Sequence, residues 1–187
     1  TSDTAYIEKG NLSDSAYCIL NNYFEGIADT SEHLVAFIDH FRELDEPVVI
    51  VLYGDHKPWL GNAYVVYHEL GINIDLSTQE GFYNFYTTPY IIWANDAAKD
   101  VLKNDFTGYG GDISPCFLMN KVFDLCAWEG NAFMKASNVL YGATDIVSAD
   151  GYFREHGDLA TSLSDASEQI YNDYRKIEYY RQHNFSY

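Results

Sequence analysis

The sequence predicts an α/β fold, and three observations carry the prediction. Between residues 23 and 44 apolar side chains recur at steps of three and four, as they do on one face of a helix. The continuous apolar run 48–53 is typical of strands that are buried on both faces of a parallel sheet, and a second, less continuous apolar run, 87–95, is predicted to be another buried strand. Helical and extended patterns then alternate along the 187 residues, without an internal repeat or a low-complexity linker.

The first predicted elements are a long helix and the strand that follows it. Residues 1–22 are expected to be an irregular lead-in, and the helix is expected over about 23–44. One face of this helix is apolar and much of the other is charged; the apolar face holds Ile27, Leu34, Phe37, Ile38, Phe41 and Leu44. A short polar turn and Pro47 end it, and Val48–Tyr53 is then predicted to be a strand.

The middle of the chain carries local signals for helix ends. A helix is predicted over about 60–70, and Gly71 is expected to end it. Asn95 closes the second apolar run and is the predicted N-cap of a short helix that reaches Lys103. Ser114 as N-cap, with Pro115 at the first helical position, predicts another helix to about Trp128.

The C-terminal part is predicted to contain two further helices around a weak hairpin. Residues 131–141 form the first helix, 145–153 the hairpin with its turn at Asp150-Gly151, and a clear apolar periodicity from 163 to about 181 the second helix. Two or three strands are too few for a self-sufficient sheet. We therefore expect residues 1–187 to be a single, partial domain, whose exposed sheet edge favours self-association.

Composition and charge exclude several classes of protein. The formal net charge is −17 and no cluster of Lys or Arg occurs, so nucleic-acid binding is not expected. No run approaches the roughly 18 apolar residues that cross a bilayer, so these 187 residues are expected to be soluble. Of the three cysteines, Cys116 and Cys126 are expected to be buried thiols; whether any two of Cys18, Cys116 and Cys126 pair is left open.

The motif with the clearest chemistry is "VVIVLYGDHKPWLG", residues 48–61. Gly54 follows the predicted strand, and a bend there would allow Asp55 and His56 to point toward one place. A carboxylate oxygen and an imidazole nitrogen suit manganese or zinc better than calcium. The structural alternative is that Asp55 caps the following helix while His56 is hydrogen-bonded in the turn. Two ligands alone do not complete a metal site.

Four stretches in this order resemble the C-terminal half of a sulfatase-type catalytic domain: "VVIVLYGDHKP", "YTTPYIIWAND", "ISPCFLMNKVFDLCAW" and "YNDYRKIEYYRQHNF". The resemblance covers about 23–185. It is closest to the lipoteichoic acid synthase and phosphoglycerol transferase branch of the alkaline phosphatase superfamily. It implies the C-terminal part of an alkaline phosphatase-like α/β/α sandwich with an incomplete sheet. It also implies that Asp55 and His56 bind one divalent metal, manganese first, with zinc or magnesium as alternatives.

The same resemblance implies an activity and a location. A threonine or serine nucleophile takes a phosphoglycerol or phosphoethanolamine group from an anionic phospholipid and passes it to a glycan or lipid acceptor. Such proteins act at the extracytoplasmic face of a bacterial membrane, anchored by upstream transmembrane helices. The nucleophile is expected upstream, so this chain is expected to be an inactive fragment without a catalytic residue. Lys57 is a candidate phosphate contact, the alternative being a solvated lysine in a turn.

Two other functions remain open. A sulfatase or phosphodiesterase of the same superfamily would share the metal pair but transfer its group to water. A non-catalytic module, or a pseudoenzyme, would use some of the 17 tyrosines to hold a glycan. Glycan binding by such a module is predicted to be indifferent to metal and to the Asp55 and His56 side chains.

Overall fold

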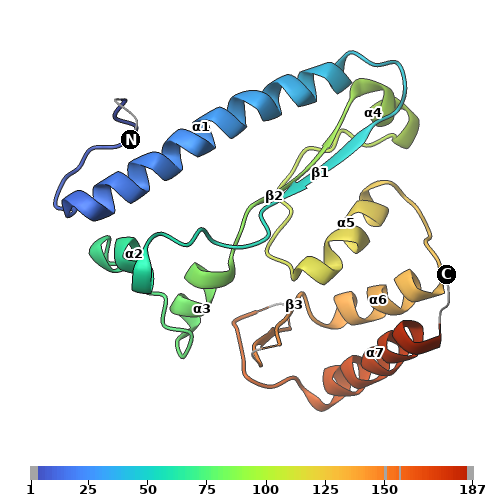
Figure 1. The fold of residues 1–187 in the computed structure, drawn as a ribbon. Coiled ribbons are helices and arrows are strands. Elements are labelled where there is room, and N and C mark those ends of the chain that lie inside the picture. The colour runs from blue at the N-terminus through green and yellow to red at the C-terminus, as the bar shows by residue number, and fades with distance from the viewer. Residues whose placement is uncertain (1–3, 150, 156, 185–187) are drawn as a thin grey trace. The chain divides into compact units, whose positions relative to one another are not determined.

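The computed structural model describes residues 4–149, 151–155 and 157–184, and the chain divides into two compact units, 1–101 and 102–187. Figure 1 shows the order of the elements along the chain. Composition gives no sign of a boundary near residue 101. A single partial domain over 1–187 stays a prediction, because two such units can belong to one domain.

The first unit begins with a helix that is longer than expected. Helix α1 spans Asp14–Arg42, and the Ser13 hydroxyl accepts a hydrogen bond from the Ala16 N–H at 3.2 Å. The irregular lead-in expected over 1–22 therefore ends at Ser13, and that expectation is wrong for 14–22. The cap, the acidic first turn and the four-residue spacing of Leu12, Ala16 and Leu20 were all readable in the sequence.

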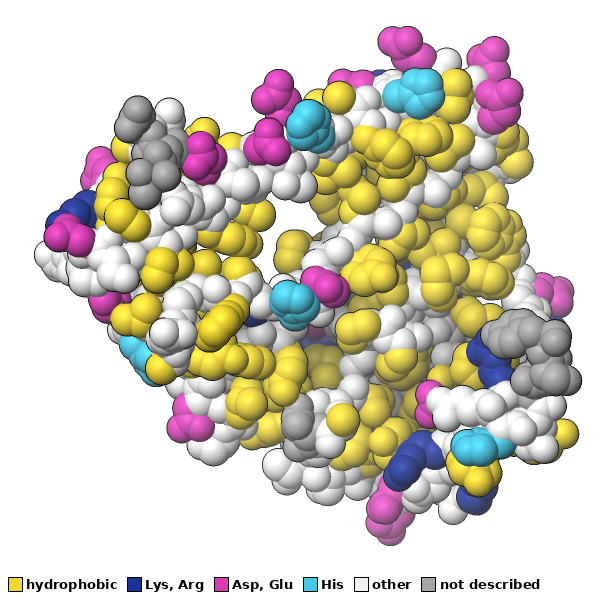
Figure 2. Space-filling model, in the orientation of Figure 1, with side chains coloured by type: hydrophobic (Ala, Val, Ile, Leu, Met, Phe, Trp, Pro, Cys, Tyr) yellow, Lys and Arg dark blue, Asp and Glu magenta, His cyan; other side chains and the backbone are white. Residues whose placement is uncertain are grey.

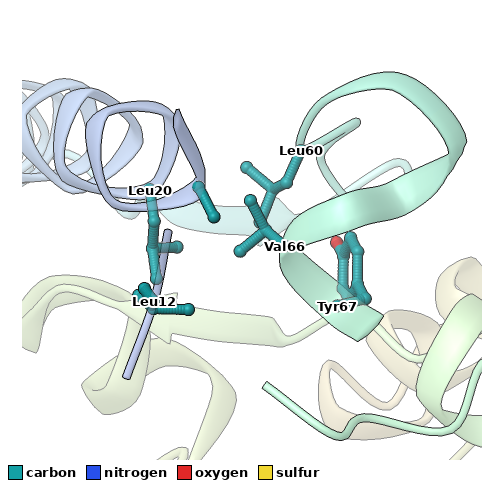
Figure 3. Close-up of a cluster of buried hydrophobic side chains, with 6 residues drawn as sticks. Leu12, Leu20, Leu60, Val66 and Tyr67 are labelled. Carbon is teal, nitrogen blue, oxygen red and sulfur yellow. The ribbon is translucent and has the colours of Figure 1, made fainter. Parts of the chain in front are cut away.

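A buried cluster joins the N-terminal part of α1 to the segment around α2. A 3₁₀ turn, η1, covers Asn62–Tyr64, and α2 covers Val65–Glu69. The regular helix expected over 60–70 starts late because Tyr64 has a left-handed backbone, and Gly71, with φ +68°, follows its end. The cluster, drawn in Figure 3, contains Leu12, Ala16, Leu20, Leu60, Val66 and Tyr67. Burial of each leucine or valine side chain stabilises the folded state by about 1.5–3 kcal/mol.

The two predicted strands pair with each other. Strand β1 covers Val49–Tyr53 and β2 covers Tyr90–Ala94; they are antiparallel, with Val49 opposite Ala94 and Tyr53 opposite Tyr90. The expectation of parallel strands is therefore wrong for this pair. An apolar run reports burial on two faces and says nothing about strand direction. Within the described residues each strand has one partner, so each keeps an unpaired outer edge. Self-association through this edge stays a prediction.

Much of the apolar surface around this pair is exposed. Figure 2 shows hydrophobic side chains gathered over the C-terminal half of α1 and over the strand pair. Val35 and Phe37 of α1 are exposed, and so is Ile91 of β2. The sequences of the two strands suggest full burial, but most of their residues are only half-buried.

Two short helices flank β2. Helix α3, Gln79–Tyr86, precedes it and was not predicted. Helix α4, Asp96–Leu102, follows it, and the Oδ1 atom of Asn95 accepts a hydrogen bond from the Ala98 N–H at 2.9 Å. The N-cap predicted for Asn95 is thus confirmed.

The glycine inside α3 yields a stability prediction. A Cβ atom at Gly81 would overlap the backbone of Asp75, whereas one at Gly26 of α1 would meet nothing within 4 Å. We expect Gly81→Ala to destabilise the protein by about 2–3 kcal/mol through overpacking. The matched change Gly26→Ala should stabilise it by about 0.5–1 kcal/mol, since alanine favours a helix interior. Urea unfolding compares them, and equal effects would contradict the close approach at Gly81.

The second unit consists of helices around a short hairpin. Its elements are η2 (Pro115–Phe117), α5 (Leu118–Leu125), α6 (Ala132–Ala143), β3 (Ile146–Val147), β4 (Phe153–Arg154) and α7 (Asp165–Asn184). Strands β3 and β4 pair as the predicted hairpin. Its predicted turn residue Asp150 lies outside the described residues.

Two details of this unit differ from expectation. The Ser114 hydroxyl caps no helix; it donates to the Val147 carbonyl at 2.9 Å and accepts from the Val147 N–H at 2.7 Å. Cys126 is buried as expected, but Cys116 is an exposed residue. Partial burial of its sulfur nevertheless raises the pKa of Cys116 to about 11. All three cysteines are free thiols.

Candidate functional site

The candidate site lies on the loop that follows β1, and its first residue is tied to the start of β2. The Gly54 N–H donates to the Pro89 carbonyl at 3.0 Å, and the Thr88 hydroxyl donates to the Gly54 carbonyl at 2.6 Å. A Cβ atom at residue 54 would lie 3.0 Å from the Thr88 Cβ. Glycine is therefore favoured here because it permits this close approach between strand ends.

The other end of the loop is tied to α2. The Tyr67 hydroxyl donates to the Pro58 carbonyl at 2.8 Å, and Leu60 is buried in the apolar cluster of Figure 3. Three residues, Asp55, His56 and Lys57, thus occupy a short loop whose two ends are both anchored.

The side chains of Asp55 and His56 lie next to each other at the surface. Asp55 Oδ1 accepts a hydrogen bond from the His56 N–H at 2.9 Å, while Asp55 Oδ2 lies 3.6 Å from His56 Nε2. Their side chains are 79% and 77% exposed. Two ligand atoms that each lie about 2.1 Å from a tetrahedral metal are about 3.4 Å apart. The observed separation is therefore compatible with a shared metal ion.

A second hydrogen bond fixes the tautomer of the imidazole. His56 Nδ1 lies 2.9 Å from the Lys57 carbonyl oxygen. Because a carbonyl oxygen only accepts, Nδ1 carries the hydrogen, and in the neutral ring Nε2 keeps its lone pair on the side of Asp55. Metal-binding histidines are commonly oriented by such a bond to the other ring nitrogen.

The structure also bears on the alternative to a metal. Asp55 bonds the next residue's N–H and caps no helix, whereas His56 is hydrogen-bonded in the turn, as that alternative expected. Across the described residues no three His, Cys, Asp or Glu side chains are grouped so that they could hold a metal ion. The donor pair fits manganese or zinc, and suits the oxygen-preferring magnesium less well. Two such donors alone do not complete a metal site.

A pocket of about 370 Å³ adjoins the pair. Asp55, His56 and Lys57 all line it, together with Trp59, Tyr64, Tyr67, Ile74, Asn84, Phe85 and Tyr86. The wall is mainly aromatic, and Trp59 is 68% exposed. Carboxylate, imidazole and ammonium groups thus lie at one side of an apolar cavity, an arrangement suited to a ligand with one charged and one apolar part.

Sequence reasoning found the charged side of this pocket but missed one aromatic wall. Asn84, Phe85 and Tyr86 come from α3. Two signals in the sequence could have found this helix: Thr78, whose hydroxyl accepts from the Gly81 N–H at 3.0 Å as an N-cap, and Pro89 shortly after its end.

Within the described residues, none of the helices combines the length and the apolar character needed to cross a membrane.

Comparison with known proteins gives two matches. The family described as Sulfatase matches residues 3–126. A protein of Rhizobium meliloti (strain 1021), provisionally named a cyclic beta-1,2-glucan modification protein, is 27% identical over 123 residues. The aligned region covers 65% of this chain but only 18% of that relative. No solved structure matches the chain. Since the family match covers more than half of the sequence, and includes the Gly-Asp-His loop, this chain belongs to the Sulfatase family of the alkaline phosphatase-like superfamily.

Proposed function

We propose that this chain is the C-terminal part of a metal-dependent phosphoglycerol or phosphoethanolamine transferase, in which Asp55 and His56 are two of the metal ligands. One observation supports this most strongly. A carboxylate oxygen and an imidazole nitrogen lie 3.6 Å apart on an anchored loop, with the tautomer that leaves the nitrogen free to bind. Because the chain spans 18% of its matched relative, the activity of the whole protein is part of this proposal.

Each residue of the site has a distinct proposed role. A divalent metal, manganese first and zinc or magnesium as alternatives, supplies charge neutralisation at phosphoryl oxygens and lowers the pKa of a hydroxyl nucleophile. Asp55 and His56 hold that ion. Lys57 offers a point charge to a phosphate oxygen, and the aromatic wall that includes Trp59 takes the glycerol or apolar part of the donor. The nucleophile and the remaining ligands are supplied from outside these 187 residues.

The substrates and the location follow from the same proposal. The donor is an anionic phospholipid, and the acceptor is a glycan or a lipid. The provisional name of the Rhizobium meliloti relative, a glucan modification protein, supports a glycan acceptor. The reaction takes place at the extracytoplasmic face of a bacterial membrane, to which upstream transmembrane helices anchor the protein.

A hydrolase is the second candidate, because membership of the Sulfatase family alone fits a sulfatase or a phosphodiesterase equally well. The two candidates differ in the acceptor of the phosphoryl or sulfuryl group. In a transferase it is an organic hydroxyl, and in a hydrolase it is water.

One assay distinguishes these functions. The full-length protein is incubated with vesicles of headgroup-labelled phosphatidylglycerol and a neutral glucan. We expect label to move to the glucan, to stop with a chelator, and to resume when manganese is added. If label is released only as free glycerol phosphate, the protein is a hydrolase and the transferase proposal is wrong. Transfer that continues unchanged in the chelator would contradict the metal-dependent proposal.

A further inference from the structure

The second unit contains a pocket that the proposed metal site does not use. Its volume is about 530 Å³, within the range of about 300–1,000 Å³ typical of small-molecule sites. It is lined by the loop 110–113, by α5 and the residues after it, by α6, and by Asp145 and Arg154. Its lining contains carboxylates, carboxamides and aromatic rings.

The single arginine of this lining is already engaged. Arg154 donates to the Asp145 carboxylate through Nε at 2.7 Å and through Nη2 at 3.0 Å. It also donates to the Asp112 carbonyl at 2.6 Å and approaches the Asp112 carboxylate at 3.3 Å. The side chain is 14% exposed. Arg154 therefore fixes the positions of two aspartates that line the pocket, and its charge is neutralised there.

An exposed aromatic ring is held in place at the end of α5. The Trp128 N–H donates to the Phe123 carbonyl at 2.8 Å and the Ala127 N–H to the Asp124 carbonyl at 3.1 Å, with φ +52° at Ala127. This is the Schellman arrangement, which ends α5 and brings the two flanking apolar side chains together. The Trp128 and Phe123 rings accordingly meet edge to face at 5.4 Å, while Trp128 remains 50% exposed.

A chain of hydrogen bonds orients the amides on the α6 side. The Ser137 hydroxyl donates to Asn120 Oδ1 at 3.0 Å, and Asn120 Nδ2 donates to Asn138 Oδ1 at 2.6 Å. Ser137 and Asn120 are buried, so they fix the orientation of the exposed Asn138 side chain. In that orientation the Asn138 Oδ1 atom faces Asn120, and its amino group can donate to a ligand. Burial, with the Asp145 and Asp124 carboxylates nearby, raises the pKa of Tyr141, whose hydroxyl therefore stays protonated.

These groups disfavour anionic ligands. Three lining aspartates face one neutralised arginine, so phosphates, nucleotides and anionic headgroups are repelled. Exposed carboxylate and amide groups beside an aromatic ring fit a neutral ligand that carries many hydroxyl groups.

We propose that this pocket binds a neutral oligosaccharide. A sugar ring presents an apolar C–H face, which suits the exposed Trp128 ring, and hydroxyls at its edge, which pair with carboxylate and amide groups. Asp124 and Asn138 are the exposed polar partners for those hydroxyls. This inference goes beyond the proposed transferase, because it uses none of the residues around Asp55 and needs no metal.

Calorimetry on the full chain tests this site. The probes are neutral tetrasaccharides of glucose, galactose and N-acetylglucosamine, with a sulfated tetrasaccharide as the charged comparison. We expect at least one neutral probe to bind and the sulfated one not to bind. Trp128→Ala should weaken binding ~tenfold or more, and Trp128→Phe less. Asp124→Asn removes charge with little change of shape, so it should weaken binding without affecting the fold.

The controls separate this inference from the proposed function. Tyr179→Ala removes a comparably exposed aromatic ring of the same unit that lies outside the pocket lining, and should leave binding unchanged. Binding should also survive a chelator and Asp55→Ala. The inference is overturned if no neutral probe binds, if Trp128→Ala and Asp124→Asn bind as tightly as the parent chain, or if Asp55→Ala abolishes binding. None of these results bears on metal binding at Asp55 and His56.

Discussion

Replacement of Asn95 by alanine is expected to lower the free energy of unfolding by about 3–5 kcal/mol, because five backbone groups would lose their hydrogen-bond partner at once. Asn95 is 1% exposed. Its Oδ1 atom accepts from the N–H groups of Val48 at 3.0 Å and Ala98 at 2.9 Å. Its amino group donates to three carbonyls, those of Phe41 (3.2 Å), Leu44 (3.2 Å) and Glu46 (2.8 Å).

This one side chain therefore joins the end of α1, the start of β1 and the first turn of α4. Urea unfolding, with hydrogen exchange of the β1 amides, measures its contribution. Asn95→Asp should be nearly as damaging, because it places a carboxylate oxygen against three carbonyls. Asn131→Ala is the comparison: its Oδ1 accepts only from the Met134 N–H among the bonds described, and its loss should cost about 1 kcal/mol. Similar losses for Asn95→Ala and Asn131→Ala would contradict the network.

In the full-length protein, Asp55→Asn and His56→Gln are each expected to lower kcat for group transfer by about 10³-fold or more. A bound metal supplies several kcal/mol of charge stabilisation in the transition state, and each 1.36 kcal/mol corresponds to a factor of ten. Either change removes one of the two metal ligands that we propose for this chain. The measurement is the initial rate of label transfer at saturating donor and manganese.

The chain offers a matched control for this prediction. His33 Nε2 and Asp29 Oδ1 of α1 are 3.7 Å apart, and both side chains are exposed, so the pair resembles His56 and Asp55 in separation and exposure. Neither Asp29 nor His33 lines the aromatic pocket. Asp29→Asn and His33→Gln should leave the rate within about twofold, since exposed pairs of this kind contribute little. Equal loss in both sets of variants would show that Asp55 and His56 have no special role.

Local signals in the sequence were sufficient for much of the fold. Asn95 as a cap and the hairpin between 145 and 153 are confirmed because each depends on neighbouring residues alone. The direction of β1 relative to β2 is set by the path of 54–89, which no local pattern encodes, and the parallel expectation failed there. The end of α5 at Leu125 depends on Ala127, an alanine in a left-handed conformation usually taken by glycine.

For the candidate site, the residue pair was predictable from the sequence but its geometry was not. Adjacent positions after a strand identified Asp55 and His56 as a possible pair. Their 3.6 Å approach and the hydrogen bond that fixes the His56 tautomer depend on how the loop folds back, and were not readable. The aromatic wall from α3 was missed because Asn84, Phe85 and Tyr86 reach the loop only through tertiary packing.

The most direct test of the central claim is anomalous diffraction at the manganese edge from crystals of the full-length protein grown with manganese. We expect a peak within bonding distance of both an Asp55 carboxylate oxygen and His56 Nε2, with further ligands from the upstream part of the protein. A manganese peak elsewhere, with Asp55 and His56 in contact only with each other and with solvent, would contradict it.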